Sequence, residues 1–124
     1  SVRAGMLIID AIEYSEASVR CLVTGQAYSI AFSILQACDK RYSYPHAQLM
    51  FHQISLGDIK VNSDYFDQEL ARCRKAEQEM FEKISQKSGQ PLEKIEGWAL
   101  EEYIFEADQA LQYNFIDSIA TKND

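Results

Sequence analysis

The sequence predicts an α/β fold made of repeated strand and helix units, with one long helix projecting from it. Two patterns predict this class: short apolar runs alternate with longer amphipathic segments, and Gly, Asn or Pro residues separate them. The chain has 124 residues, of which 47% are hydrophobic and 25% charged, the balance of an ordinary globular protein with one core. We therefore expect a single domain over residues 1–124.

The apolar spacing predicts each element of the first half in turn. Residues 3–14 repeat apolar side chains with helical spacing, and residues 19–24 form a short apolar strand. A turn at Gly25 leads from that strand to a helix over residues 29–38. Two further strands are expected near residues 41–43 and 49–53.

The second half begins with the longest predicted helix, residues 65–88, capped by the polar residues 62–64 and closed by Gly89. Its apolar positions recur every three or four residues and form one stripe: Phe66, Leu70, Cys73, Met80 and Ile84. Either the helix covers its own sheet with this stripe, or it contacts another subunit.

Shorter elements complete the chain. Pro91 is placed to begin a helix in which Leu92, Ile95 and Trp98 share one face. Residues 103–105, 107–113 and 115–120 read as strand, helix and strand. Asn114 stands at the exit of that helix, where a left-handed conformation is expected, and Asn tolerates it better than most residues.

Ser29 is the candidate nucleophile, because it stands where the strand, the Gly turn and the start of the next helix meet. The N–H groups at a helix N-terminus favour the negative charge of an alkoxide or oxyanion. The alternative is that Ser29 only caps the helix, as Ser commonly does.

A serine nucleophile needs a base, and the chain has two histidines. His52 ends an apolar, strand-like run, and functional groups gather at the carboxyl ends of strands in α/β sheets. His46 follows Pro45 in a polar stretch and is expected in a loop. The alternative for His52 is a structural role at the strand end.

These segments resemble the Clp protease proteolytic subunit (ClpP) family. Residues 25–30, Gly-Gln-Ala-Tyr-Ser-Ile, resemble the segment around the family's nucleophile, and residues 49–53, Leu-Met-Phe-His-Gln, resemble the segment around its catalytic histidine. Residues 101–119 are similar to its closing pattern, and residues 4–6 and 88–95 match as well. The resemblance implies a ClpP/crotonase-like fold and covers nearly the whole chain.

Carried over by residue, the resemblance makes Ser29 the nucleophile, His52 the general base and Glu102 the orienting carboxylate, where the family typically has Asp. Glu101 is the substitute for that third role, and a solvated helix end is the alternative for Glu102. The Ile30 N–H is the expected oxyanion donor. The family's other donor comes from a Gly-Gly turn that would lie immediately before the first residue here.

Two further departures concern substrate binding. Tyr28 precedes the nucleophile where the family has a small residue, so we expect a narrower cleft. Residues 55–63 stand where the family has a Gly-rich strand that pairs with substrate and with the opposite ring, and only Gly57 is glycine.

The resemblance also implies an assembly. In the family the long helix is a handle between two stacked heptameric rings, which enclose the active sites, and an AAA+ unfoldase delivers polypeptide substrates. By this comparison the chain lacks an N-terminal segment, and we expect a fragment, an incompletely observed chain or a degenerate paralogue. The resemblance implies a cytoplasmic location, or an organellar one if an upstream segment is missing.

Three functions stay open at this point. The first is a ClpP-like serine endopeptidase subunit, and the second is a catalytically inactive ring subunit with a role in assembly. The third is a crotonase-type acyl-CoA enzyme, which the Ser29 and His52 motifs disfavour.

Composition argues against several other classes. The net charge of −7, without a Lys/Arg cluster, argues against nucleic-acid binding. No run is long enough to cross a membrane, and no Gly-rich phosphate loop or metal-ligand spacing is present, so we expect no cofactor or metal. Cys21, Cys38 and Cys73 lack a disulfide framework, so we expect all three to be reduced, with Cys21 in a buried strand.

Overall fold

The computed structural model describes residues 2–54 and 64–123, which form the predicted helices and strands in the predicted order, with one strand added. In chain order the elements are α1 (Val2–Glu13), β1 (Arg20–Val23), β2 (Gln26–Tyr28), α2 (Ile30–Ala37), β3 (Lys40–Ser43), β4 (Gln48–Met50), α3 (Asp64–Ser88), α4 (Leu92–Glu101), β5 (Phe105–Glu106), α5 (Ala107–Gln112) and β6 (Ser118–Ile119). The expectations for residues 55–63, including Gly57, lie outside the described residues.

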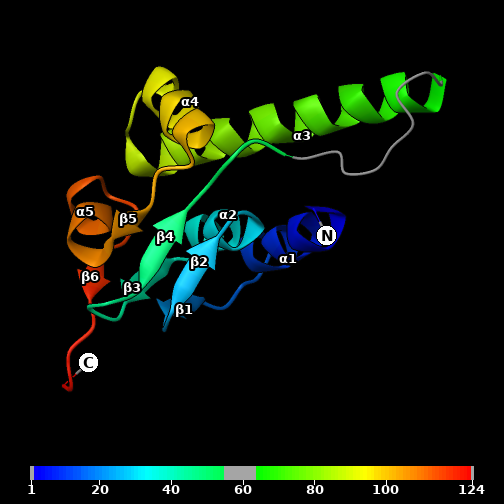
Figure 1. Ribbon diagram of the computed structural model, residues 1–124. Coiled ribbons are helices and arrows are strands. Elements are labelled where there is room, and N and C mark those ends of the chain that lie inside the picture. The colour runs from blue at the N-terminus through cyan, green and yellow to red at the C-terminus, as the bar shows by residue number, and fades with distance from the viewer. Residues whose placement is uncertain (1, 55–63, 124) are drawn as a thin grey trace.

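The strands of the described part form two three-stranded sheets (Figure 1). The first has the order β1-β3-β6 and is parallel throughout, and the second has the order β2-β4-β5, with β2 parallel and β5 antiparallel to β4. Each of the first two strand–strand–helix units therefore contributes one strand to each sheet. This confirms the α/β class.

The added strand, β2, corrects the prediction that the Gly25 turn leads directly into a helix. Ala27 is buried between Gln26 and Tyr28, which are more exposed, so the segment alternates as a strand with one buried face does. One strand therefore separates the turn from Ser29, and three residues are too few for a clear sequence signal.

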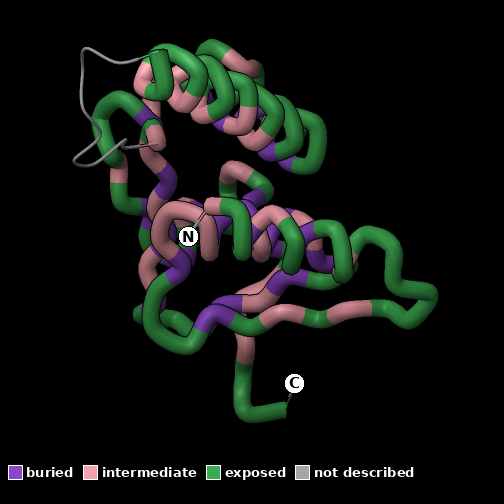
Figure 2. Tube along the Cα trace, turned by 90° about the vertical axis from the view of Figure 1, so that its right-hand side faces the viewer, coloured by how far each residue is buried: buried purple, intermediate pink, exposed green. Residues whose placement is uncertain are grey.

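The helices pack one on the next: α1 on α2, α2 on α3, and α3 on α4. Figure 1 shows α3 extending well past the other elements, as predicted for the long helix. The buried residues of α3, namely Glu77, Phe81, Ile84 and Ser88, all lie in its second half, and Figure 2 shows burial concentrated where the helices and sheets meet. The first half is an arm on which Phe66 and Leu70 are only half-buried.

Aromatic side chains form the centre of the core. Phe32 of α2 lies 4.7 Å from Phe51, ring centroid to centroid, and Phe105 lies 5.0 Å from Phe115. Trp98 of α4 packs edge-on against Phe105 at 5.2 Å. A fully buried Phe contributes roughly 1.5–3 kcal/mol by removal from water. Phe51, the residue before His52, is therefore anchored in the core.

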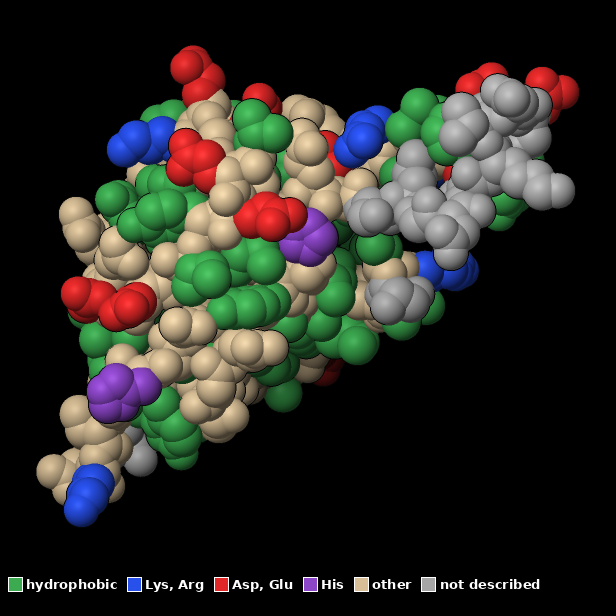
Figure 3. Space-filling model, in the orientation of Figure 1, with side chains coloured by type: hydrophobic (Ala, Val, Ile, Leu, Met, Phe, Trp, Pro, Cys, Tyr) green, Lys and Arg blue, Asp and Glu red, His purple; other side chains and the backbone are tan. Residues whose placement is uncertain are grey.

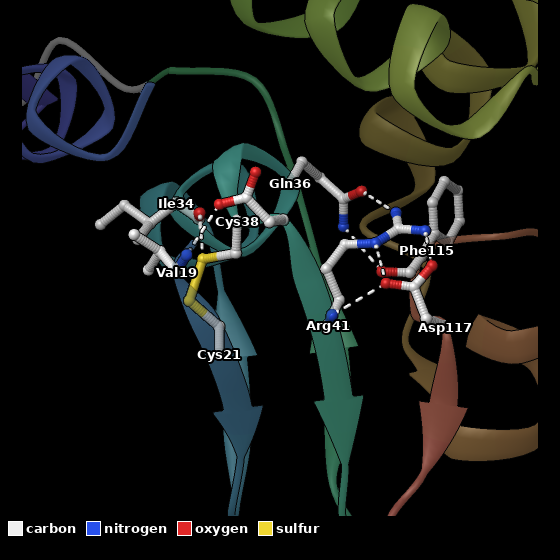
Figure 4. The surroundings of a disulfide bond; sticks show 9 residues. Val19, Cys21, Ile34, Gln36, Cys38, Arg41, Phe115 and Asp117 are labelled. Carbon is white, nitrogen blue, oxygen red and sulfur yellow. Dashed lines mark hydrogen bonds and ion pairs between the residues drawn. A yellow bond between two sulfur atoms is a disulfide. The ribbon is translucent and has the colours of Figure 1, made fainter. Parts of the chain in front are cut away.

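A buried arginine ties the end of the chain to β3 (Figure 4). Arg41 is 2% exposed, and its guanidinium donates to both oxygens of Asp117, at 2.9 and 3.2 Å, and to Gln36 Oε1 at 2.6 Å. It also donates to the carbonyl oxygen of Asn114. Asn114 has φ 63°, which confirms the left-handed conformation predicted at this position. The hydrogen bonds from Arg41 outweigh the opposing effect of burial and lower the pKa of Asp117 below its usual value of 3.8.

The cysteine prediction is wrong for two of the three residues. Cys21 of β1 and Cys38, the C-cap residue of α2, form a disulfide bond (Figure 4), and Cys73 is free. Cys38 is fully buried, whereas Cys21 is half-buried rather than in a fully buried strand. The spacing carried no signal because the pair meets only once α2 has folded back to bring its end beside β1.

Candidate active site

Ser29 occupies a sharp turn between β2 and α2, where its backbone has φ 61° and ψ −126°. Side chains with a Cβ rarely adopt this conformation, and holding it costs about 1–3 kcal/mol. Two hydrogen bonds keep the turn in place: the Ser29 N–H donates to Met50 O at 2.8 Å, and the Phe32 N–H donates to Ser29 O at 3.0 Å. A strained serine between a strand and a helix is the geometry of a nucleophile elbow.

The capping alternative for Ser29 does not fit this geometry. Its side chain makes no capping hydrogen bond, and a capping Ser normally has extended backbone angles. Ser29 is half-buried, and its hydroxyl does not cap the helix.

Ile30 begins α2, so its N–H has no acceptor within the helix. No other hydrogen bond of this N–H is found in the described part of the chain. Its side chain packs directly on Gly5 of α1, where an added Cβ would clash with Ile30 Cγ1. The absence of a side chain at Gly5 therefore lets α1 cross close to the Ser29 turn.

His52 follows β4 by two residues and is half-buried. Tyr28 pairs with Met50 in the parallel register, so Ser29 and His52 leave their strands at the same edge of one sheet. His46 is exposed in the turn before β4, at the opposite end of that strand. The topology therefore brings His52, and not His46, to the Ser29 side.

On the face drawn in Figure 3, histidine side chains reach the surface in two separate places. Among the described residues, no hydrogen bond joins the Ser29 hydroxyl to the His52 imidazole. Catalytic hydrogen bonds are often long in a substrate-free enzyme and tighten when substrate binds.

Glu102 ends α4 as its C-cap residue, with φ 52° and ψ 46°. Its N–H donates to Ala99 O at 3.2 Å, while its side chain is exposed and makes no ion pair with another described residue. Glu101, the substitute, is also exposed at the end of the helix. The structure does not join either carboxylate to His52 by a hydrogen bond.

Tyr28 is bonded away from the turn that follows it. Its hydroxyl donates to Gln48 Oε1 at 2.8 Å, and Gln48 lies two residues before Met50 on β4. The phenol is therefore held toward the start of β4 rather than toward the residues that follow it.

The sequence reasoning missed Glu77. It is one of the four buried residues of α3, and its carboxylate accepts a hydrogen bond from the Ile54 N–H, two residues after His52, at 2.8 Å. The signal was an interruption: Glu77 lies four residues after Cys73 and three before Met80, so it puts a charge in line with the apolar stripe.

Residues 2–54 and 64–123 contain no group of three His, Cys, Asp or Glu side chains that could hold a metal ion. Within the same residues, no helix is both apolar and long enough to cross a membrane.

Comparison with known proteins gives one consistent result. A family model described as Clp protease matches residues 1–123. The "ATP-dependent Clp protease proteolytic subunit 2" of Thermobifida fusca is 38% identical over 98% of this chain and 60% of its own length. The protein of the same name from Rhodococcus jostii is 34% identical over 98% of this chain and 63% of its own length.

A third relative, the "ATP-dependent Clp protease proteolytic subunit" of Porphyromonas gingivalis, is 34% identical over 99% of this chain and 56% of its own length. The chain thus spans less than two thirds of each of these relatives. Because the match covers nearly all of its own residues and includes both the Ser29 and the His52 segments, the chain belongs to the Clp protease family.

Proposed function

We propose that this chain is part of a serine endopeptidase subunit that cleaves unfolded polypeptides. The observation that carries the proposal is the Ser29 turn, which is strained, uncapped and bonded through its N–H to Met50, two residues before the candidate base. Strain at a position that performs no capping is typical of functional sites.

In the proposed reaction, Ser29 Oγ attacks the substrate carbonyl carbon while His52 accepts the hydroxyl proton. The carbonyl oxygen gains a negative charge, which the Ile30 N–H stabilises at the N-terminus of α2. His52 then returns the proton to the leaving amine as the peptide bond breaks. Water, deprotonated by His52, hydrolyses the acyl ester and restores Ser29.

Glu102 is the proposed orienting carboxylate, because it stands at the position of the family's third catalytic residue. In this role it accepts the second N–H of His52 and fixes the tautomer. Replacing Glu102 by Gln should then lower the rate of reaction at Ser29 by about 10²-fold or more. An unchanged rate would assign the role to another carboxylate, with Glu101→Gln as the next variant.

The proposed assembly is a homo-oligomer of heptameric rings that encloses the active sites, works with an AAA+ unfoldase and resides in the cytoplasm. Support comes from α3, whose first half projects from the molecule with Tyr65 59% exposed and Phe66 and Leu70 half-buried. Analytical ultracentrifugation tests the assembly: a chain that sediments only as a monomer would contradict it.

Labelling with a fluorophosphonate probe tests the catalytic proposal, because the probe reacts with an activated serine and needs no cleavage specificity. We expect modification of the wild type at Ser29, none in Ser29→Ala, and a strongly reduced rate in His52→Ala. The exposed His46→Ala variant is the matched control and should label normally. Absence of labelling in the wild type would favour the inactive ring subunit instead.

A further inference from the structure

Glu77 stands out as a charge in the apolar stripe of α3. The buried positions of this helix are Glu77, Phe81, Ile84 and Ser88, spaced four, three and four residues apart. The Glu77 side chain is only 11% exposed, so it faces the core and not the solvent. A buried carboxylate is costly unless it is paired and hydrogen-bonded, so its partners identify its role.

Two donors satisfy one oxygen of this carboxylate. Arg74, one turn earlier on α3, donates from Nη1 to Glu77 Oε2 at 2.8 Å and balances the charge. The Ile54 N–H donates to the same oxygen, also at 2.8 Å. The first bond stays within the helix, whereas the second joins α3 to the segment that follows β4, seen in Figure 1 running up toward that helix.

The bond to Ile54 matters because the backbone around His52 has few others. Residues 51–54 belong to no helix or strand. On one side of His52, Met50 O accepts the Ser29 N–H and the Phe51 side chain is 2% exposed in the aromatic core. On the other side, the first backbone anchor found in the described residues is the Ile54 N–H on Glu77.

We propose that Glu77 is a positioning residue for His52, an inference that rests on the proposed function. The carboxylate holds the backbone two residues beyond the imidazole, and the Ser29–Met50 bond holds it two residues before. The backbone on one side of His52 is thus bonded to the Ser29 turn, and on the other side to α3. The bond is charge-assisted and largely sheltered from water, which strengthens it relative to a neutral surface bond.

A matched pair of variants isolates the hydrogen bond from the side chain's bulk. Glu77→Gln keeps the length and an acceptor oxygen, whereas Glu77→Met keeps the length and has no such acceptor. Displacing a catalytic group by about 1 Å costs up to roughly 10²-fold, so we expect kcat to fall about 10-fold or more in Glu77→Met. In Glu77→Gln, kcat should stay within about threefold of the wild type, with KM nearly unchanged in both variants.

The control on the same helix is Glu79→Ala, because Glu79 is exposed and faces away from the core. It should leave kcat unchanged. Equal losses in Glu77→Gln and Glu77→Met would overturn the proposal, since they would show that charge or packing matters and the acceptor does not. A loss shared by KM and kcat in equal measure would do the same.

A measurement without turnover separates this inference from the proposed function. The chain has two histidines, so His46→Gln leaves one imidazole signal in the NMR spectrum, that of His52. The signal should shift or broaden in Glu77→Met and keep its position in Glu77→Gln and Glu79→Ala. Amide exchange in the wild type should show Ile54 protected relative to Gln53, whatever the variants do.

The two failures are then distinct. A wild type that resists the fluorophosphonate probe but shows a protected Ile54 amide and a Glu77-dependent His52 signal contradicts the peptidase and supports the positioning. An Ile54 amide that exchanges as fast as that of Gln53 overturns the positioning, even if the probe labels Ser29.

Discussion

The backbone of Ser29 is strained, so stability conflicts there with the proposed catalytic role. A glycine accepts φ 61° without steric cost, whereas serine is strained there. The position nevertheless holds a serine, whose side chain makes no capping hydrogen bond. We interpret the strain as the cost of presenting an oxygen nucleophile at the mouth of α2.

Replacing Ser29 by Gly should therefore stabilise the protein by about 1 kcal/mol, the relief of strain being partly offset by the more flexible unfolded chain. Urea unfolding measures the difference, and fluorophosphonate labelling should be absent. Ser29→Ala is the control, because alanine keeps the Cβ and thus the strain. A Gly variant no more stable than the Ala variant would contradict the argument.

Among the elements, α1 and α2 are held together by a contact that tolerates no extra atom. A Cβ at Gly5 would clash with Ile30 Cγ1, close to the start of α2 and to the proposed oxyanion donor. Gly97, in α4, offers a contrast: apart from its chain neighbours and the backbone of its own helix, no heavy atom of the described residues lies within 4 Å of the Cβ it would gain.

Gly5→Ala should destabilise the protein by about 1–3 kcal/mol through overpacking, and it should slow labelling of Ser29 because α1 must shift. Gly97→Ala should be neutral or stabilising by up to about 1 kcal/mol, since alanine is the better helix former. Thermal unfolding of the two variants side by side provides the check. Equal behaviour would show that α1 does not pack as closely as described.

The Cys21–Cys38 disulfide joins β1 to the far end of α2 and closes a loop with a sequence separation of 17. Loops of this length gain roughly 3 kcal/mol from a disulfide, mainly through the unfolded chain. Replacing both residues by Ser should lower the free energy of unfolding by about that amount. Cys73→Ser, which removes the free thiol, should change it little, and intact mass with and without reductant reports the bond directly.

At the scale of the whole molecule, the Arg41 network joins β3, α2 and the segment leading to β6. Asp117 has a pKa below its usual 3.8, chiefly because of its hydrogen bonds from Arg41. A carboxylate with a lowered pKa contributes stability that is complete above the usual value and is lost as pH falls through the lowered one. Stability should thus decline with acidification below about pH 4.

The variant Asp117→Asn tests whether Asp117 causes this loss of stability. The free energy of unfolding of variant and wild type is measured with urea between neutral and acid pH. At pH 7 the variant should lose about 2–3 kcal/mol, less than a fully buried pair because the Asp117 side chain is 37% exposed. Its remaining stability should depend less on pH in the acid range than that of the wild type. Parallel pH profiles for the two proteins would exclude this pair as a source of acid sensitivity.

Much of this molecule is determined locally and was therefore predictable. The helices follow from apolar spacing over many residues, Asn114 from the left-handed exit of its helix, and the long helix from its repeating stripe. Family membership follows from segments of sequence around Ser29 and His52. The short strand β2 was not predicted, because three residues are too few to show the alternation of buried and exposed side chains that marks a strand.

Only the tertiary structure decided which residues distant in the chain are bonded to each other. The Cys21–Cys38 bond, the Ser29–Met50 bond and the Glu77–Ile54 bond all require separate segments to be packed before their atoms meet. Local sequence encodes backbone preference and the direction of the apolar face. It does not encode which polar group lies opposite another after folding, so the disulfide and the hydrogen bond of Glu77 follow only from the packed molecule.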